Sequence, residues 1–251
     1  MSVPRVSVIT PVWNAAATLQ ATVASVRAQS EPSWEMLVVD DGSTDGSLKL
    51  ARALAAAEPR IRVLALGVNR GCAAARNAGI RAARGRFLAF LDADDLWYPQ
   101  KLEVQLGYMA ASGAALVFSA YRRIDAAGRP LGTVTAPARL THAALLKGNA
   151  IGCLTAVYDS ARFGKVEMPP LRRRQDYGLW LRLLARGGEA HGLPQVLADY
   201  RVHAGSLSAD RLAAVGATWT LYREVAGLTR AGAGYHLAHN LARGLAKRIG
   251  G

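Results

Sequence analysis

The sequence predicts an α/β protein whose mostly parallel sheet is flanked by helices and followed by a helical C-terminal segment. Short apolar runs typical of buried strands alternate with helix-like segments over about the first 120 residues. This alternation favours right-handed crossovers between parallel strands. Polar residues also gather where each apolar run ends, and such folds bind ligands at the carboxyl ends of their strands.

The first half of the chain divides into regular elements. Strands are expected at residues 6–11, 34–40, 61–66, 87–91 and 114–120. Helices are expected at residues 15–29, 72–84 and 100–111, with one more ending near residue 57. Ser43 or Thr44 is expected to cap that last helix, because a hydroxyl oxygen there can accept a backbone N–H bond.

The second half of the chain is less regular. A polar turn is expected around residues 125–130, a helix at about 176–186 and a strand near 196–201. The tail from 211 to 249 is predicted to be helical and basic. A basic amphipathic helix of this kind can lie on an anionic membrane surface, and packing against the rest of the domain is the alternative.

Composition and charge narrow the class of protein. The 251 residues include 31 Lys and Arg against 18 Asp and Glu, a formal net charge of +13 that favours polyanionic ligands. No apolar run approaches the ~18 residues of a membrane-spanning helix, and no secretory signal precedes the first strand. We therefore expect a cytoplasmic protein, with Cys72 and Cys153 as free thiols.

The acidic cluster Asp92, Asp94 and Asp95 directly follows the apolar run at residues 87–91. Three carboxylates at the end of a buried strand are electrostatically costly unless a positive charge compensates them. Mg²⁺ is often held by one or two carboxylates together with substrate phosphates. The cluster therefore predicts a divalent cation, and the cation predicts a phosphorylated ligand.

Four segments, in this order, resemble the family-2 group of inverting glycosyltransferases with the GT-A fold. They are residues 6–14, 37–45, 69–79 and 92–95. The resemblance implies that Pro11 and Asp41 contact the base of a nucleotide-sugar, that Arg76 approaches the base or sugar, and that Asp92 approaches the ribose or sugar. The other expected contributors to the nucleotide-sugar site are Val12, Asn14, Asn69 and Ala93.

The resemblance also assigns a metal ligand and a catalytic base. Asp94 is expected to coordinate Mn²⁺ or Mg²⁺, and Asp176 to take the proton from the acceptor hydroxyl. A late loop implies His203 as a second metal ligand, and Arg201 and Ser206 as diphosphate contacts. Read singly, these residues have plainer explanations, such as a turn at Asp41, helix capping by Asp176 or a structural role for His203.

Together these features predict a metal-dependent inverting glycosyltransferase that moves a sugar from a nucleotide-diphosphate donor, most simply a UDP-sugar, to an acceptor hydroxyl. The acceptor is expected to be a saccharide or lipid-linked, as in cell-surface polysaccharide or glycolipid synthesis, with peripheral attachment at the inner face of the membrane. Residues 1–208 would form the GT-A domain, in which residues 1–120 bind the nucleotide-sugar and residues 121–208 bind the acceptor and supply the catalytic base. Residues 209–251 would form the helical tail.

Other functions remain open or are disfavoured. A non-catalytic nucleotide-sugar-binding protein and a sugar nucleotidyltransferase are the alternatives, although the nucleotidyltransferase would carry a Gly-rich loop where Pro11 to Asn14 stands. No G-x-G-x-x-G follows the first strand, which disfavours a dinucleotide-dependent oxidoreductase. No nucleic-acid partner is expected, because acids stand at the strand ends. The arginines at 172–174 fit either an acceptor phosphate or a solvated basic run.

Overall fold

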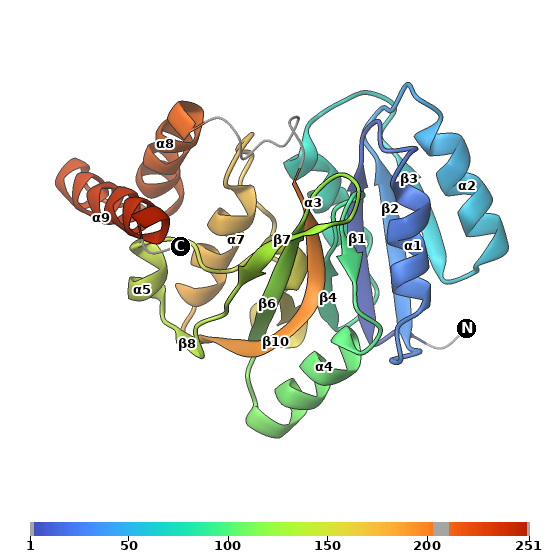
Figure 1. Cartoon of the computed structure of the whole chain (residues 1–251), viewed down its shortest axis with the longest axis horizontal. Helices are drawn as coiled ribbons and strands as arrows, with labels where there is room; N and C mark the ends of the chain where they lie inside the picture. The colour runs from blue at the N-terminus through green and yellow to red at the C-terminus, as the bar shows by residue number, and fades with distance from the viewer. Residues whose placement is uncertain (1–2, 203–210, 250–251) are drawn as a thin grey trace.

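The computed structural model describes residues 3–202 and 211–249, and its strands form one sheet flanked by helices (Figure 1). The strand order is β3-β2-β1-β4-β9-β6-β10-β5. The four parallel strands at one side are β1 (Val6–Val12), β2 (Trp34–Asp40), β3 (Ile61–Ala65) and β4 (Phe87–Phe90). They are joined by α1 (Leu19–Arg27), α2 (Ser47–Ala57) and α3 (Cys72–Ala82). The predicted α/β class is confirmed.

The expected cap of α2 is wrong. The helix begins at Ser47, its N-cap is Gly46 with φ +92°, and no side chain caps it. Ser43 Oγ instead accepts the backbone N–H of Asn14 at 3.1 Å, and the Thr44 N–H donates to Asn14 Oδ1 at 2.8 Å. Both residues are used to join the loops after β1 and β2, so neither is available at the helix start.

The second half extends the sheet with mixed pairing. β9 (Val157–Asp159) lies antiparallel between β4 and β6 (Leu116–Ile124), and β10 (Ala190–Arg201) runs parallel to β6. Antiparallel edges come from β5 (Leu96–Trp97), β7 (Pro130–Val134) and β8 (Arg139–Leu140). The helical elements here are α4 (Lys101–Ser112), α5 (His142–Leu146), the 3₁₀ turn Cys153–Thr155, α6 (Ser160–Phe163) and α7 (Gln175–Leu184).

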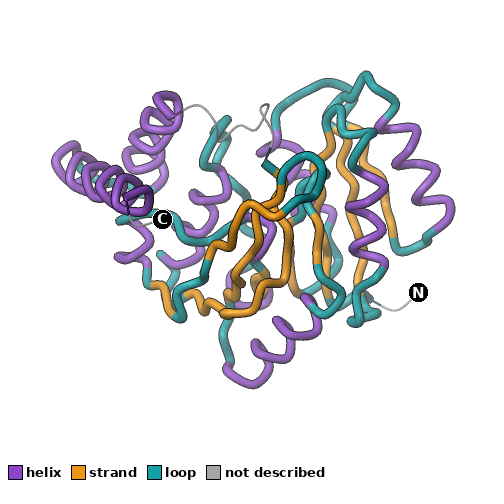
Figure 2. Tube along the Cα trace, viewed as in Figure 1, coloured by secondary structure: helices purple, strands orange, loops and turns teal. Residues whose placement is uncertain are grey.

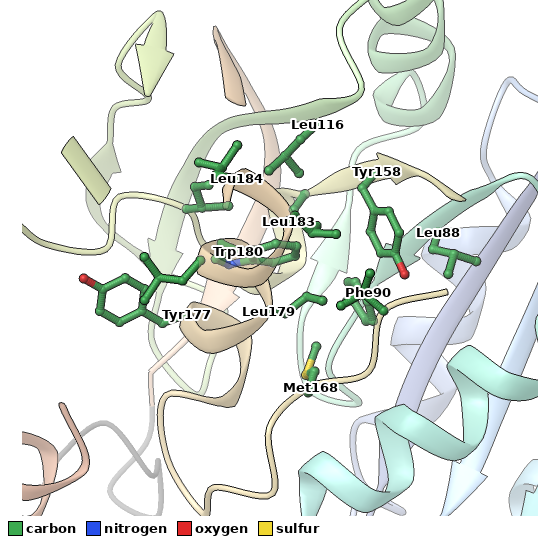
Figure 3. Close-up of a cluster of buried hydrophobic side chains, with 14 of the residues drawn as sticks. Leu88, Phe90, Leu116, Tyr158, Met168, Tyr177, Leu179, Trp180, Leu183 and Leu184 are labelled. Atoms are coloured by element: carbon green, nitrogen blue, oxygen red, sulfur yellow. The ribbon is translucent and has the colours of Figure 1, made fainter. Parts of the chain in front are cut away.

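Helix α7 lies at the centre of one hydrophobic core. Trp180 is fully buried and meets Phe90 of β4 edge to face, with ring centroids 6.0 Å apart (Figure 3). The Tyr177 hydroxyl donates to the Leu145 carbonyl at 2.6 Å, and the Tyr222 hydroxyl donates to the Leu146 carbonyl at 2.6 Å. These contacts fix α7 against the sheet and against α5.

The C-terminal helices lie at the end of the molecule opposite α2 (Figures 1 and 2). α8 (Arg211–Thr220) continues through a π-helical turn (Leu221–Val225), and α9 (Arg230–Ile249) follows. Ala233 and Leu237 of α9 pack on the core, whereas Tyr235 and Leu241 are 55% and 44% exposed. Leu241 lies one turn beyond Leu237 on the same face of α9, so this face is packed at its start and exposed further along, whereas Tyr235 lies on another face. Among the described residues, no helix is long and apolar enough to span a membrane.

Lys101, at the start of α4, is a fully buried cation. Its Nζ donates to Gln105 Oε1 at 2.5 Å and lies 4.1 Å from the centroid of the Trp97 ring. Burial lowers the pKa of Lys101 to about 7. Because that pKa lies below the value in an unfolded chain, the unfolded state binds more protons at mildly alkaline pH, and stability should increase with pH.

We therefore expect Lys101→Met to flatten the pH dependence of stability. In the native protein the Lys101 contribution to the unfolding free energy should rise from about pH 7 to 9 by up to ~1.4 kcal/mol per pH unit. Urea unfolding across this range measures the slope, and Lys49→Met, at an exposed lysine, is the control that should leave it unchanged. Equal slopes in native protein and Lys101→Met would contradict a neutral buried lysine.

Candidate active site

The loops that follow β2 and β3 are joined by the carboxylate of Asp41. Its Oδ1 accepts the backbone N–H of Arg70 at 2.8 Å, and its Oδ2 accepts that of Gly71 at 2.8 Å. Gly42 beside it has φ +74°, and a Cβ at that position would lie 2.7 Å from the backbone nitrogen of Asn69. The sequence Asp41-Gly42 thus allows the second loop to lie directly on the third.

The chain at the end of β1 leaves Pro11 and Asn14 accessible but buries the Val12 side chain. Pro11 is partly buried and Asn14 is exposed, as a ligand contact requires, but the Val12 side chain is buried and its carbonyl accepts the Asp41 N–H at 2.8 Å. Asn14 adopts φ +50° while it bonds to the loop after β2. Trp13, which the sequence analysis did not assign, is 58% exposed at this edge of the sheet.

The acidic loop after β4 is held from beneath by α1. The buried Thr22 hydroxyl lies 3.0 Å from the Ala93 carbonyl oxygen and 2.9 Å from that of Asp95, as a shared hydrogen bond. Ala93 itself is buried, so it contributes backbone position. This anchor was not visible in the sequence, because Thr22 reads there only as part of a helix face.

Asp95 is the buried member of the acidic cluster. One oxygen, Oδ1, accepts the backbone N–H of Arg201 at 2.8 Å, while Oδ2 has no hydrogen-bond partner among the described residues. Burial, and next the negative charges of Asp92 and Asp94, raise the pKa of Asp95 well above its usual range. The loop therefore concentrates negative charge that a cation would offset.

Arg76 forms the charged floor of the site. Its side chain is 4% exposed and donates through Nη2 to Asp92 Oδ1, whose side chain is 32% exposed. Burial alone would lower the pKa of Arg76, but the negative charge of the Asp92 carboxylate, and after it that of Asp176, raises it well above its usual range. The guanidinium therefore stays charged, and its Nε has no hydrogen-bond partner in the described part of the chain.

Asp176 stands in the first turn of α7, within electrostatic reach of Arg76. Burial raises the pKa of Asp176, and the positive charge of Arg76 opposes that rise. Burial raises the pKa of the Cys72 thiol, which lies near the neighbouring Gln175, to about 11. The structure thus brings Arg76, Asp92 and Asp176 together, although 100 positions separate Arg76 from Asp176 and no local sequence pattern links them.

Two thiols that the sequence analysis treated only as redox markers also face this group. Cys72 begins α3, one helical turn before Arg76, and Cys153 lies in the 3₁₀ turn; both thiols are free. The spacing of Cys72 and Arg76 by four residues on one helix face was the available signal. Burial raises the pKa of both thiols, so they line the floor as neutral groups.

Of the three residues expected from the late loop, Arg201, His203 and Ser206, the structure describes only Arg201. The Arg201 guanidinium is bonded to backbone carbonyls, with Nε 2.9 Å from the Asp94 oxygen and Nη1 2.9 Å from that of Ala126. It holds the acidic loop in place, and a diphosphate contact stays a prediction. His203 and Ser206 lie outside the described residues. Asn69 is exposed on the loop that Asp41 fixes.

A divalent cation fits this site only if the protein and a bound phosphate group coordinate it together. Among residues 3–202 and 211–249, no group of three or more His, Cys, Asp or Glu side chains is arranged to hold a metal. The partnerless Asp95 Oδ2 and the crowding of Asp92, Asp94 and Asp95 nevertheless call for positive charge. These features fit a Mg²⁺-like ion that takes one or two carboxylates and completes its shell with phosphate oxygens and water.

Comparisons with known proteins agree with this geometry. Residues 7–161 match the family described as glycosyl transferase family 2. The putative teichuronic acid biosynthesis glycosyltransferase TuaG of Bacillus subtilis is 43% identical over 223 residues, 88% of each chain. The UDP-Glc:α-D-GlcNAc-diphosphoundecaprenol β-1,3-glucosyltransferase WfgD of Escherichia coli is 34% identical over 215 residues, 85% of this chain and 83% of its own.

Solved structures share the fold. S. aureus TarS in complex with UDP-GlcNAc superimposes with a TM-score of 0.74 at 19% identity, over 94% of this chain and 71% of TarS. The mannosyltransferase PcManGT of Pyrobaculum calidifontis, in complex with GDP-Man and Mn²⁺, gives a TM-score of 0.71 at 20% identity, over 94% and 68%. The sheet and its helices are therefore those of GT-A glycosyltransferase structures.

Replacing Asp41 by Asn should loosen the loop that carries Asn69. The amide can accept one N–H through Oδ1 but presents its own N–H groups to the other, so one of the 2.8 Å bonds from Arg70 and Gly71 is lost. Amide hydrogen exchange at residues 70 and 71 should become roughly tenfold faster or more. Asp125→Asn, which alters a comparable carboxylate-to-amide turn elsewhere, should leave these two amides unchanged; unchanged exchange in Asp41→Asn would refute the anchoring role.

Proposed function

Because the chain belongs to glycosyl transferase family 2, we propose that it transfers a sugar from a nucleotide-diphosphate donor to an acceptor hydroxyl with inversion at the anomeric carbon. The observation that carries the proposal is the meeting of Arg76, Asp92 and Asp176 at the carboxyl edge of the parallel strands. That the chain is a glycosyl transfer enzyme follows from its family; the donor, the mechanism and the acceptor are the proposal.

The donor nucleotide would lie on the loops after β1, β2 and β3. Pro11, Asn14 and Asn69 are accessible there, and Asp41 holds the loops together. Asp92, partly exposed and paired with Arg76, would accept hydrogen bonds from hydroxyl groups of the ribose or the donor sugar. A UDP-sugar is favoured, since WfgD is named for UDP-Glc and TarS was solved with UDP-GlcNAc.

Asp176 would be the general base. As the acceptor oxygen attacks the anomeric carbon, its proton passes to a carboxylate oxygen of Asp176, and the bond from that carbon to the diphosphate oxygen breaks. Burial raises the pKa of Asp176, which makes the carboxylate a better proton acceptor while Arg76 keeps it ionised. General-base catalysis of this kind typically contributes about 10²–10⁴-fold in rate.

Asp94 would hold Mn²⁺ or Mg²⁺ together with the donor diphosphate, with His203 as the expected second ligand. When bound, such an ion supplies Lewis-acid stabilisation of the charge on the departing diphosphate. Thr22 and Arg201 keep the acidic loop in position for this task, because both bond to its backbone. The Mn²⁺ complex of PcManGT is consistent with a divalent cation here.

The acceptor is proposed to be lipid-linked, in the synthesis of a cell-surface polysaccharide or glycolipid. TuaG is named for teichuronic acid biosynthesis, and WfgD for an acceptor joined to undecaprenol through a diphosphate. A lipid-linked acceptor would bring the enzyme to the inner face of the membrane. Tyr235 and Leu241 of α9 are exposed and would be available for peripheral contact there.

Asp176→Asn is expected to bind donor normally and to lose transfer. The amide is nearly isosteric but cannot accept the proton, so kcat should fall about 10²–10⁴-fold while the Kd for UDP-sugar changes little. Release of UDP in the presence of acceptor measures turnover, and Asp125→Asn, the same change at a turn outside the site, is the control that should keep native turnover. Near-normal turnover of the Asp176→Asn variant would show that Asp176 is not the general base. If the native protein bound the donor without any turnover, the alternative of a non-catalytic nucleotide-sugar-binding protein would be favoured.

Chelation of divalent cations should abolish transfer, and Mn²⁺ or Mg²⁺ should restore it. Asp94→Ala should bind the nucleotide-sugar more weakly in the presence of Mn²⁺ but bind the free nucleoside with unchanged affinity, because only the diphosphate shares the ion. Calorimetric titration with UDP-glucose and with uridine separates the two effects. Full activity in excess chelator would show that the reaction needs no divalent cation.

Exposed apolar groups on α9 give a direct test of membrane contact. The double change Tyr235→Ser and Leu241→Ser should reduce sedimentation with phosphatidylglycerol-containing vesicles severalfold without lowering Tm, because both side chains are already exposed. Leu131→Ser, at a 49% exposed leucine of β7, is the matched control. Equal sedimentation of the α9 variant and this control would mean that α9 serves only to pack on the domain.

A further inference from the structure

We propose that the hollow between residues 171–173 and helix α8 binds the phosphate nearest the acceptor sugar of a prenyl-diphosphate-linked acceptor. The hollow has a volume of about 280 Å³ and is lined by Leu171, Arg172, Arg173, Ala217 and Thr220. The inference rests on the proposed transfer reaction and extends it by assigning the anionic part of the acceptor to particular side chains.

The position of the hollow fits an acceptor that reaches the catalytic base. Arg173 precedes Asp176 by three residues, so their Cα atoms are at most about 11 Å apart. Arg174 between them adopts φ +65° and is the N-cap of α7. A sugar whose attacked hydroxyl lies at Asp176 would therefore place its anomeric phosphate on the side of Arg172 and Arg173.

The chemistry of the walls matches an amphiphile with an anionic head. Arg guanidinium groups bind phosphate oxygens through paired N–H donors, and the Thr220 hydroxyl can donate a further bond. Leu171 and Ala217 supply apolar surface to the same hollow, as the first methylenes of a prenyl chain require.

The surroundings of the hollow point toward a membrane surface. Trp219 of α8 is 36% exposed next to the lining residue Thr220, and α9 exposes Tyr235 and Leu241 at the same end of the molecule (Figure 1). Tryptophan and tyrosine are favoured at the level of lipid headgroups. A lipid diphosphate in the hollow would thus lie near the bilayer surface from which its chain extends.

A larger hollow beside the other end of α7 is a poorer phosphate site. It has a volume of about 540 Å³, and its cations Arg182 and Lys165 donate to the carbonyl oxygens of Glu167 at 2.8 Å and of Arg81 at 3.2 Å. Arg182 also lies six residues beyond Asp176, about 9 Å along the helix axis in the direction away from the acidic loop. These cations do not adjoin the reaction centre.

Farnesyl diphosphate tests the hollow without requiring the acceptor sugar. Its binding is titrated calorimetrically with the donor site filled by saturating UDP and Mg²⁺. The double variant Arg172→Ala, Arg173→Ala should bind it at least tenfold more weakly, with unchanged affinity for UDP and an unchanged Tm. Arg52→Ala, at an exposed arginine of α2, should bind like the native protein. In the native protein, farnesol should bind far more weakly than farnesyl diphosphate, and so should inorganic pyrophosphate.

Three outcomes would overturn the proposal. They are equal affinity of native and double-variant protein for farnesyl diphosphate, loss of this binding when UDP occupies the donor site, and binding of pyrophosphate as tight as that of farnesyl diphosphate.

If the double variant were poorly folded, the single variant Arg173→Gln would replace it, and its affinity for farnesyl diphosphate should be at least fivefold weaker. The binding test needs no turnover, so a failure of the proposed transfer reaction would appear separately, as an absence of UDP release from native enzyme with intact farnesyl diphosphate binding.

Discussion

The buried guanidinium of Arg76 is the constraint on which the site depends. Asp92 and Asp176 are carboxylates from distant parts of the chain that both lie near Arg76, and burial disfavours the ionised form of Asp176. Arg76, 4% exposed and bonded to Asp92, compensates both charges. A single cation thereby allows the proposed donor contact and the proposed base to lie side by side.

Helix α3 transmits this constraint to the rest of the fold. Beside Arg76, the Asn77 side chain forms two hydrogen bonds with the Met168 backbone, at 2.9 Å and 2.8 Å. The half of the chain that carries the nucleotide loops is thus fixed to the half that carries Asp176. A buried ion pair adds little net stability by itself, so its value here lies in positioning.

The regular elements were predictable where the hydrophobic pattern was uninterrupted. The strands β1 to β4 and the helices between them appear close to the expected ranges, since each apolar run or helical face is local. β10 was expected near residues 196–201 but begins at Ala190, because Gly192 and Pro194 interrupt the pattern where the strand shifts register against β6. The cap of α2 failed for a tertiary reason, since Ser43 and Thr44 bond to Asn14 of another loop.

By itself the sequence determined the fold class, the order of the loops and the residue types of the site. The hydrophobic pattern of a buried strand and the residue types of a turn depend only on residues that are close together in the sequence. Asp41, Asp92, Asp94 and Asp176 could each be proposed from short motifs. Only the tertiary structure decided their relations: that Arg76 is buried against Asp92, that Thr22 and Arg201 hold the acidic loop, and that Cys72 and Cys153 complete the floor. Those relations depend on long-range packing of helices on the sheet, and no local pattern encodes which distant side chains will share a low-dielectric space.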